Sequence, residues 1–250
     1  MALPTQDQGF FGKVYKRDIV GTNVALKKVP FRHMKAEDID REKRVYRSIC
    51  HPNVVKLICD PWLDKTDWKW NIPLEYIKGC NLEKIMFLSP GCIQLTKQVI
   101  NKIIIGMCSG LREMHNKNII HQDLKPDNIM VENYTHRAVI IDLGLAKFER
   151  NGIFSGPEGG NRYYIAPEVL RGCQRDKGSD VWAMGKIIAE LLITPRERLP
   201  TLITGTSIGS RLSGNPYCNI VSSMVKTDPT FRPTMENVKE YFKAANLRWY

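Results

Sequence analysis

Two short polar segments, each set against apolar residues, most constrain what this 250-residue chain can fold into. Residues 121–128 (HQDLKPDN) lead directly into the apolar residues 129–131, which read as a short strand. The apolar run 138–141 ends in Asp142-Leu143-Gly144, so that a strand delivers a carboxylate to a glycine-containing turn. Together Asp123, Asn128 and Asp142 become candidates for binding a hard cation such as Mg²⁺, or for handling protons.

The hydrophobic pattern divides the chain into a strand-rich part and a helical part. Up to about residue 76, segments 10–15, 23–29 and 54–59 read as strands, with a turn at 20–23 and a helical stripe in 35–50. Beyond residues 78–79 the apolar stripes at 100–114 and 181–193 are helical. We predict one α+β, bilobal domain over residues 1–250. A small β-rich N-lobe (about 1–77) with one key helix precedes a larger, mainly helical C-lobe (about 78–250), and a ligand cleft lies between them.

Four motifs, in order, resemble those of the eukaryotic protein kinase family across residues 8–241. Residues 121–128 resemble its catalytic loop H-R-D-L-x-x-x-N, 142–144 its D-F-G, 24–27 its V-A-I-K strand, and 166–168 its A-P-E. A single Asp or Asn in a turn is more often a cap, so the ordered set carries the resemblance. It implies the two-lobed protein kinase-like fold and transfer of a phosphoryl group from Mg·ATP to proteins. By the same resemblance, a lysine at position 125, two residues after Asp123, is typical of serine/threonine kinases.

The resemblance also implies roles for individual residues. Asp123 would be the catalytic base for the substrate hydroxyl, and Lys125 would neutralise charge on the transferring phosphoryl group. Lys27 would hold the α- and β-phosphates with Glu42 as its partner, while Asn128 and Asp142 would hold Mg²⁺. Further contacts with ATP are expected from Gly9, Gly12, Val14, Ala25, Leu74, Glu75, Ile77 and Met130.

Local geometry supports two of these roles and leaves one open. Strand alternation places Ala25 and Lys27 on one face and Lys28 on the other, although two surface lysines are the alternative. Glu42 lies on the apolar stripe of its helix, where an unpaired carboxylate is costly, and a solvated glutamate is its alternative. Residues 7–14 (DQGFFGKV) resemble the family's nucleotide loop G-x-G-x-x-G-x-V, and this is the weakest motif because Asp7 replaces the first glycine. A hairpin with two glycines would look the same.

Two departures from the family pattern concern the catalytic and D-F-G motifs. Gln122 replaces the arginine that binds an activation-loop phosphate in the family. We therefore expect activity that does not depend strictly on phosphorylation of the activation loop, which lies between Asp142 and Glu168. Ser155, Tyr163 and Tyr164 in this segment are open to modification. Leu143 replaces phenylalanine but keeps an apolar side chain, and we expect a mild effect.

Other positions give structural expectations. Asn161 stands where serine/threonine kinases carry a threonine that contacts the catalytic aspartate and lysine. Pro73 lies just before Glu75, Tyr76 and Ile77, which match the family's hinge that bonds adenine. It departs from the family pattern because a strand residue without an N–H group breaks local pairing, and an edge strand is the alternative. By resemblance, Glu168 is expected to pair with Arg232, and Asp180 to brace the catalytic loop.

Charge and composition narrow the possible partners. A net charge of +11 suits acidic protein substrates, but the sequence contains no zinc-finger, RNP or helix-turn-helix pattern that would signal nucleic-acid binding. No apolar run approaches the roughly 20 residues of a membrane span. The seven cysteines are scattered without a C-x-x-C pair, which indicates neither a disulfide framework nor a zinc site. We expect a soluble protein in a reducing, cytoplasmic compartment.

Two rival functions remain open. Asp7, Gln122 and Asn161 would suit a pseudokinase, a scaffold that keeps the fold without efficient phosphoryl transfer. A kinase-fold enzyme for small molecules is the other rival. The Ala-Pro-Glu segment at 166–168 disfavours it, because that segment helps to build a platform for peptides.

Overall fold

The N-terminal sheet depends on a tight hairpin at Val20 and Gly21. Both residues adopt positive φ angles, 51° and 78°, as a two-residue hairpin turn requires. The structure is a computed structural model and describes residues 7–9, 12–88, 92–149, 161–193, 196–245 and 247. Its first sheet has the order β1-β2-β3-β5-β4 with antiparallel neighbours: β1 (Asp7–Gly9), β2 (Gly12–Ile19), β3 (Thr22–Pro30), β4 (Trp62–Asp64) and β5 (Lys69–Glu75).

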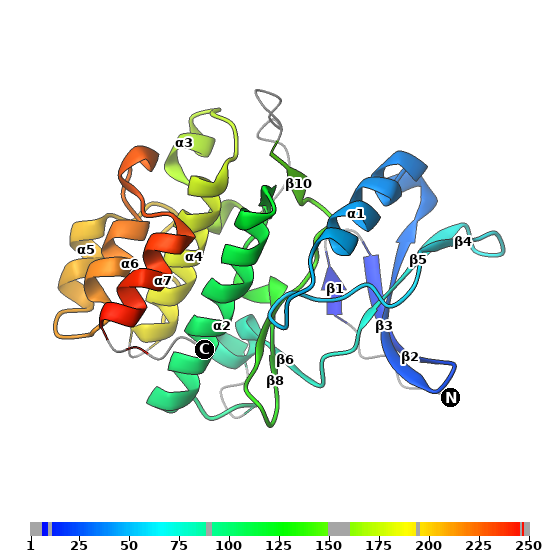
Figure 1. The fold of residues 1–250 in the computed structure, drawn as a ribbon, viewed down its shortest axis with the longest axis horizontal. Helices are drawn as coiled ribbons and strands as arrows, with labels where there is room; N and C mark the ends of the chain where they lie inside the picture. Colours follow the sequence, from blue (N-terminus) through cyan, green and yellow to red (C-terminus); the bar gives the residue numbers. More distant parts are fainter. Residues whose placement is uncertain are drawn as a thin grey trace.

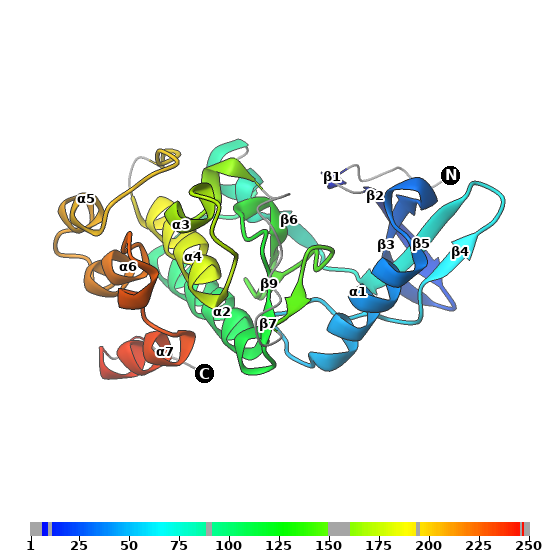
Figure 2. The same ribbon diagram turned by 90° about the horizontal axis from the view of Figure 1, so that it is seen from above.

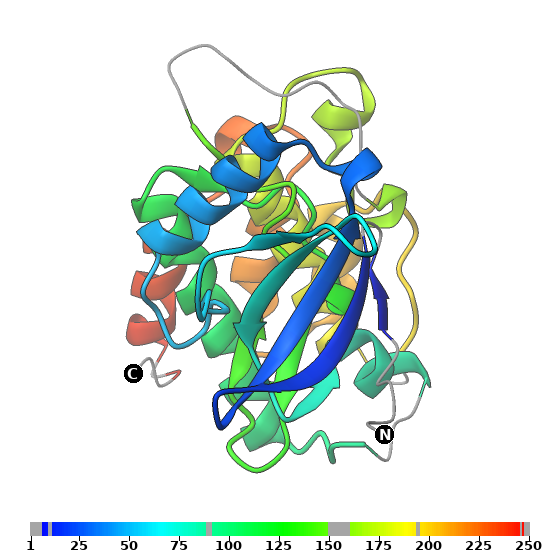
Figure 3. The same ribbon diagram turned by 90° about the vertical axis from the view of Figure 1, so that its right-hand side faces the viewer.

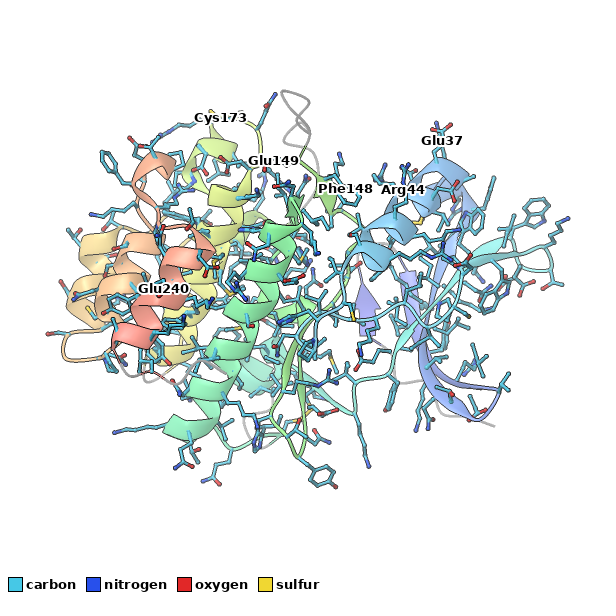
Figure 4. All side chains as sticks on the ribbon, viewed as in Figure 1. Glu37, Arg44, Phe148, Glu149, Cys173 and Glu240 are labelled. Carbon is cyan, nitrogen blue, oxygen red and sulfur yellow. A yellow bond between two sulfur atoms is a disulfide. The ribbon has the colours of Figure 1, made fainter. Side chains whose placement is uncertain are left out.

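One helix, α1 (Ala36–Ser48), accompanies this sheet, as predicted (Figures 1 and 3). Its buried face presents Ile39, Glu42, Val45 and Tyr46, while Glu37 on the outer face is exposed (Figure 4). The predicted strand at 54–59 is wrong. Val54 bridges to Ile140 and Leu57 bridges to Leu74, so the segment joins two different sheets and forms a regular ladder with neither.

The second lobe packs around two long helices, α2 (Lys97–Asn116) and α4 (Lys177–Leu192), which confirm the two predicted apolar stripes (Figure 1). Along α2, Ile103, Met107, Leu111 and Met114 have no exposed surface. Burial of such apolar faces stabilises each helix more than its intrinsic propensity does. Around them lie α3 (Pro167–Leu170), α5 (Gly205–Arg211), α6 (Cys218–Met224) and α7 (Met235–Ala244).

Two small sheets carry the loops that lie next to the first lobe (Figure 2). One has the order β6-β8-β9 and the other pairs β7 with β10: β6 (Gly79–Asn81), β7 (Ile119–Ile120), β8 (Ile129–Glu132), β9 (Ala138–Ile140) and β10 (Lys147–Phe148). Only glycine fits at position 79, because the Cβ atom of any other residue would lie 1.8 Å from the carbonyl oxygen of Val131. This close approach holds the connection between the lobes against β8. In the described part of the chain, no helix is both long and apolar enough to cross a membrane.

The edge-strand alternative for Pro73 is wrong. Pro73 does not lie on an edge strand, because β5 runs between β3 and β4. It is tolerated because β4 reaches only as far as Asn71, and the Pro73 carbonyl accepts a hydrogen bond from the Ile58 N–H at 2.9 Å. The spacing of the cysteines indicates no disulfide framework. The structure nevertheless contains a disulfide between Cys80 in β6 and Cys92, which lies shortly before α2.

Glu168 and Arg232 form the predicted ion pair in the second lobe. Each carboxylate oxygen of Glu168 accepts one hydrogen bond from the guanidinium at 2.6 Å, in the bidentate geometry that favours arginine. Both residues are buried, and Arg232 also lies 5.1 Å from the centre of the Trp182 ring. The pair joins the Ala-Pro-Glu segment to the loop before α7.

Replacing Arg232 by alanine should destabilise the domain by about 3–5 kcal/mol, because it leaves the Glu168 carboxylate buried without its partner. The matched control is Arg211→Ala, which removes an exposed ion pair with Glu197 and should cost less than about 1 kcal/mol. Urea unfolding of both variants measures the difference. Equal losses of unfolding free energy would contradict this account.

Candidate active site

A cavity of about 590 Å³ lies between the two lobes. Of the predicted nucleotide contacts, its lining includes Gly12, Val14, Ala25, Lys27, Leu74, Glu75, Ile77 and Met130. The second lobe contributes the side chains of Lys125, Asn128 and Asp142 to the same cavity. Gly9 ends β1, where it pairs with Gly12, and positions 10 and 11 of the same loop lie outside the described residues. The inter-lobe cleft predicted from the sequence is therefore present, and residues from both lobes meet in it.

Lys27 lies in the strand face that borders this cavity and contacts two carboxylates. Its Nζ atom is 3.2 Å from Oε1 of Glu42 on α1 and 2.7 Å from Oδ1 of Asp142. Lys28 points to the opposite face and bonds Asp67 at 3.3 Å, as strand alternation predicts. The alternatives of two surface lysines and a solvated glutamate are therefore wrong.

The electrostatics of this cluster keep Lys27 and Asp142 charged. Burial alone would lower the pKa of Lys27, but Asp142 and then Glu42 outweigh it, so the pKa lies well above its ordinary value. Burial would likewise raise the pKa of Asp142, but the positive charge of Lys27 holds it below the ordinary value. The two shifts have one cause, the attraction between the ammonium and the carboxylate.

Close packing between β2 and β3 depends on Gly12. A Cβ atom at this position would lie 2.3 Å from the carbonyl oxygen of Lys28, so any other residue would push the strands apart. The register pairs Val14 with Lys27. Gly12 thus holds β2 over the part of β3 that carries Lys27.

Asp180, at the start of α4, braces the catalytic loop as predicted. Its carboxylate accepts hydrogen bonds from the backbone N–H groups of His121, at 2.7 Å, and of Gln122, at 3.0 Å. It also bonds the ring of His115 at 3.1 Å. With Gln122 at a φ angle of 70°, these contacts fix a backbone turn directly before Asp123.

Three donors surround the carboxylate of Asp123. Lys125 Nζ donates to Oδ2 at 2.9 Å, and Asn128 Nδ2 donates to the same oxygen at 3.0 Å. The backbone N–H of Asn161 donates to Oδ1 at 3.0 Å. The side chain of Asn161 caps its own turn instead, by accepting from the Tyr163 N–H at 2.9 Å. Position 161 therefore contacts the aspartate through its main chain, which does not depend on the residue type.

Asn128 and Asp142 fit a magnesium ion that also binds phosphate oxygens. The amide nitrogen of Asn128 donates to Asp123, which leaves its oxygen as the atom for a cation. Asp142 lies in the turn after β9 with a positive φ angle of 58°, and one of its oxygens bonds Lys27. In the described part of the chain, no group of three or more His, Cys, Asp or Glu side chains would hold a metal alone. Two oxygen ligands match the way Mg²⁺ binds together with a nucleotide.

Sequence reasoning did not identify two residues that shape the site. The hydroxyl of Tyr46 on α1 accepts a hydrogen bond from the Leu143 N–H at 3.4 Å. The buried Arg175 donates from Nη1 to the carbonyl of Gln122 at 2.6 Å. The helical stripe contained Tyr46, but no pattern in the sequence pointed to Arg175, which follows the Ala-Pro-Glu segment.

The two tyrosines that follow Asn161 differ in exposure. Tyr163 is 54% exposed, whereas Tyr164 is 4% exposed and its hydroxyl donates to Glu190 at 2.7 Å. The expectation that Tyr164 is open to modification is therefore wrong for this conformation. Ser155, the third candidate, lies outside the described residues.

Comparison with known proteins decides the family. The model of the protein kinase domain matches residues 7–242. The chain belongs to the protein kinase family. Similar curated proteins include cyclin-dependent kinase 7 of Carassius auratus, 34% identical over 94% of this chain and 66% of that protein. The mouse serine/threonine-protein kinase DCLK3 is 27% identical over 87% of this chain and 29% of that protein. The Schizosaccharomyces pombe serine/threonine-protein kinase shk2 is 30% identical over 74% and 32%.

These relatives agree with the serine/threonine class predicted from the sequence, and the two-lobed α+β fold agrees with the family. The chain spans between 29% and 66% of the lengths of these relatives.

Replacing Lys27 by methionine should lower kcat/KM for ATP by about 10²–10³-fold, because it removes the only lysine of β3 that faces the cavity. Lys28→Met is the matched control, since the neighbouring side chain bonds Asp67 on the opposite face. Steady-state kinetics with a generic protein substrate separates the two. Similar losses in both variants would show that the two lysines are equivalent.

Proposed function

We propose that this domain transfers the γ-phosphoryl group of Mg·ATP to serine and threonine hydroxyls of protein substrates. One observation carries the proposal: Lys27 from the first lobe, and Asn128 and Asp142 from the second, line the same cavity. Asp123 lies beside it, bonded to Asn128 at 3.0 Å. Phosphoryl transfer asks a protein mainly to position its reactants and to stabilise charge, and this arrangement offers both.

Each residue has a physical task in this proposal. Lys27, held by Glu42, would bind the α- and β-phosphates. Asp123 would orient the substrate hydroxyl and accept its proton, and Lys125 would offset charge at the transferring group. Asn128 and Asp142 would hold Mg²⁺, which neutralises phosphate oxygens when bound. The adenine would lie against Ala25, between Leu74 and Met130, next to the hinge residues Glu75 and Ile77.

Several broader features belong to the same proposal. The net charge of +11 favours acidic protein substrates. Residues 1–250 would form one kinase domain that works inside the cell, where ATP is supplied. One observation opposes this location: the Cys80–Cys92 disulfide, since disulfides persist mainly in oxidising compartments.

The Asp123→Asn variant should lose about 10²–10⁴-fold in phosphoryl transfer while it keeps nucleotide affinity, because the amide cannot accept a proton. Transfer of radiolabelled phosphate to a basic protein and to an acidic one, followed by phosphoamino-acid analysis, measures this. If the unaltered domain and the variant bind ATP but are equally silent, the scaffold function replaces the enzyme.

Dephosphorylation of the purified domain should leave most of its activity. Gln122 carries no charge to bind an activation-loop phosphate, and Arg175 donates to the main chain of the catalytic loop instead. Activity before and after phosphatase treatment, with mass spectrometry to establish that phosphate was removed, measures the effect. Complete loss of activity would contradict this expectation.

A further inference from the structure

Lys186 lies in the middle of α4 with none of its surface exposed. Its ammonium donates to the carbonyl of Tyr163 and, at 2.6 Å, to the carbonyl of Pro200. The same nitrogen lies 5.3 Å from the centre of the Tyr164 ring. The two carbonyls belong to different segments, the 3₁₀ turn Arg162–Tyr164 and the loop before α5.

A lysine in this place calls for an explanation, because its neighbours Ile187, Ile188 and Leu191 are all buried apolar residues. Lysine is rarely fully buried, and a charge removed from water is costly unless it is bonded. An apolar side chain would fill the same volume without that cost. The role of the charged ammonium is therefore to bond the two backbone carbonyls of Tyr163 and Pro200.

A short chain of contacts leads from Lys186 to the catalytic aspartate. The residue that it holds through its carbonyl, Tyr163, donates its own N–H to Asn161 Oδ1 at 2.9 Å. The backbone N–H of Asn161 donates to Asp123 Oδ1 at 3.0 Å. The turn Arg162–Tyr164, which follows Asn161, exposes Arg162 and Tyr163. These side chains lie beside the catalytic loop, where a protein substrate would present its hydroxyl.

Glu190 strengthens the same anchor from one turn further along α4. It accepts hydrogen bonds from the Tyr164 hydroxyl at 2.7 Å and from the Leu199 N–H at 2.9 Å. Two neighbouring charged groups on one buried helix thus hold the same two segments. A group that only stabilised the core would not need hydrogen-bond partners in both segments.

We propose that Lys186 is a positioning residue for the protein substrate: it holds the turn Arg162–Tyr164 in place beside Asp123 and ties that turn to the loop at Pro200. The inference rests on the proposed protein kinase activity and adds a residue that sets affinity for the protein substrate but not for ATP. The nucleotide cavity does not include Lys186 among its lining residues.

The charge on Lys186 titrates in an accessible range. Burial lowers its pKa to about 8, and the nearby carboxylate of Glu190 opposes that shift. The Tyr164 phenol also faces it, and burial and then Glu190 raise the pKa of that phenol, with a smaller influence from Asp127. Above pH 8 the amine becomes neutral and its hydrogen bonds to the two carbonyls weaken.

Lys186→Met should raise KM for a protein or peptide substrate about tenfold at pH 7 and leave KM for ATP within about twofold. Lys186→Gln keeps a neutral donor and should give an intermediate KM. Lys102→Met is the matched control, since Lys102 is an exposed helical lysine on α2. In the unaltered domain, substrate KM should rise severalfold between pH 7 and 9 relative to KM for ATP. Lys186→Met should lack that rise.

An unchanged substrate KM in Lys186→Met would overturn the inference, as would a fall in kcat alone with both KM values constant, which marks fewer folded molecules. If this variant does not fold, the pH profile of the unaltered domain decides. If the unaltered domain transfers no phosphate, the proposed function fails and hydrogen exchange at Tyr163 and Tyr164 tests the anchor separately. Faster exchange in Lys186→Met, or in the unaltered domain above pH 8 after correction for the intrinsic rate, supports the inference. Unchanged protection contradicts it.

Discussion

The contact on which the two-lobed arrangement most depends is the ion cluster of buried Lys27 and Glu42 with the partly buried Asp142. Its members come from β3, from α1 and from the turn after β9, so three elements must meet for any one charge to be paired. A buried charge without a partner is strongly destabilising, whereas a complete set is tolerated. The cost of leaving Lys27 unpaired therefore links the position of α1 to the second lobe. Tyr46, one turn beyond Glu42, adds a second link through the Leu143 N–H.

The second lobe uses the same physics along one helix. Helix α4 is apolar nearly all round, yet it carries Asp180, Lys186 and Glu190 in its buried surface. Each of these groups holds backbone atoms of another segment: the catalytic loop, the turn at 162–164 and the loop at 199–200. Backbone groups are the partners that any sequence supplies, so a rigid central helix can fix several loops with few polar side chains. The core and the site are therefore parts of one structure.

Features that follow a local period could be predicted from the sequence. Alternation in a strand separates Lys27 from Lys28, and helical spacing places Glu42 on the inner face of α1. Contacts between distant segments do not follow from local spacing. The Glu168–Arg232 pair and the brace from Asp180 are expected only through the family resemblance, and other distant contacts could not be predicted. The period of 54–59 resembles a strand, but its residues bridge to two different sheets. Nothing in the spacing of Cys80 and Cys92 shows that the chain brings them together, and Arg175 reaches Gln122 only through the path of the segment after Glu168.

The departures at Gln122 and Asn161 matter less than their residue types suggest, because neither side chain is among the three donors that bond the Asp123 carboxylate. Asn161 keeps its contact with Asp123 through a backbone N–H, which every residue except proline has. Gln122 removes a charged side chain from the loop, but Arg175 places a buried guanidinium on the carbonyl of that same residue. The carboxylate of Asp123 is held by two side chains and one main-chain group. Substitutions at 122 and 161 change how the loop is supported and leave the donors around Asp123 in place, which favours a working catalytic site over a scaffold that has lost it.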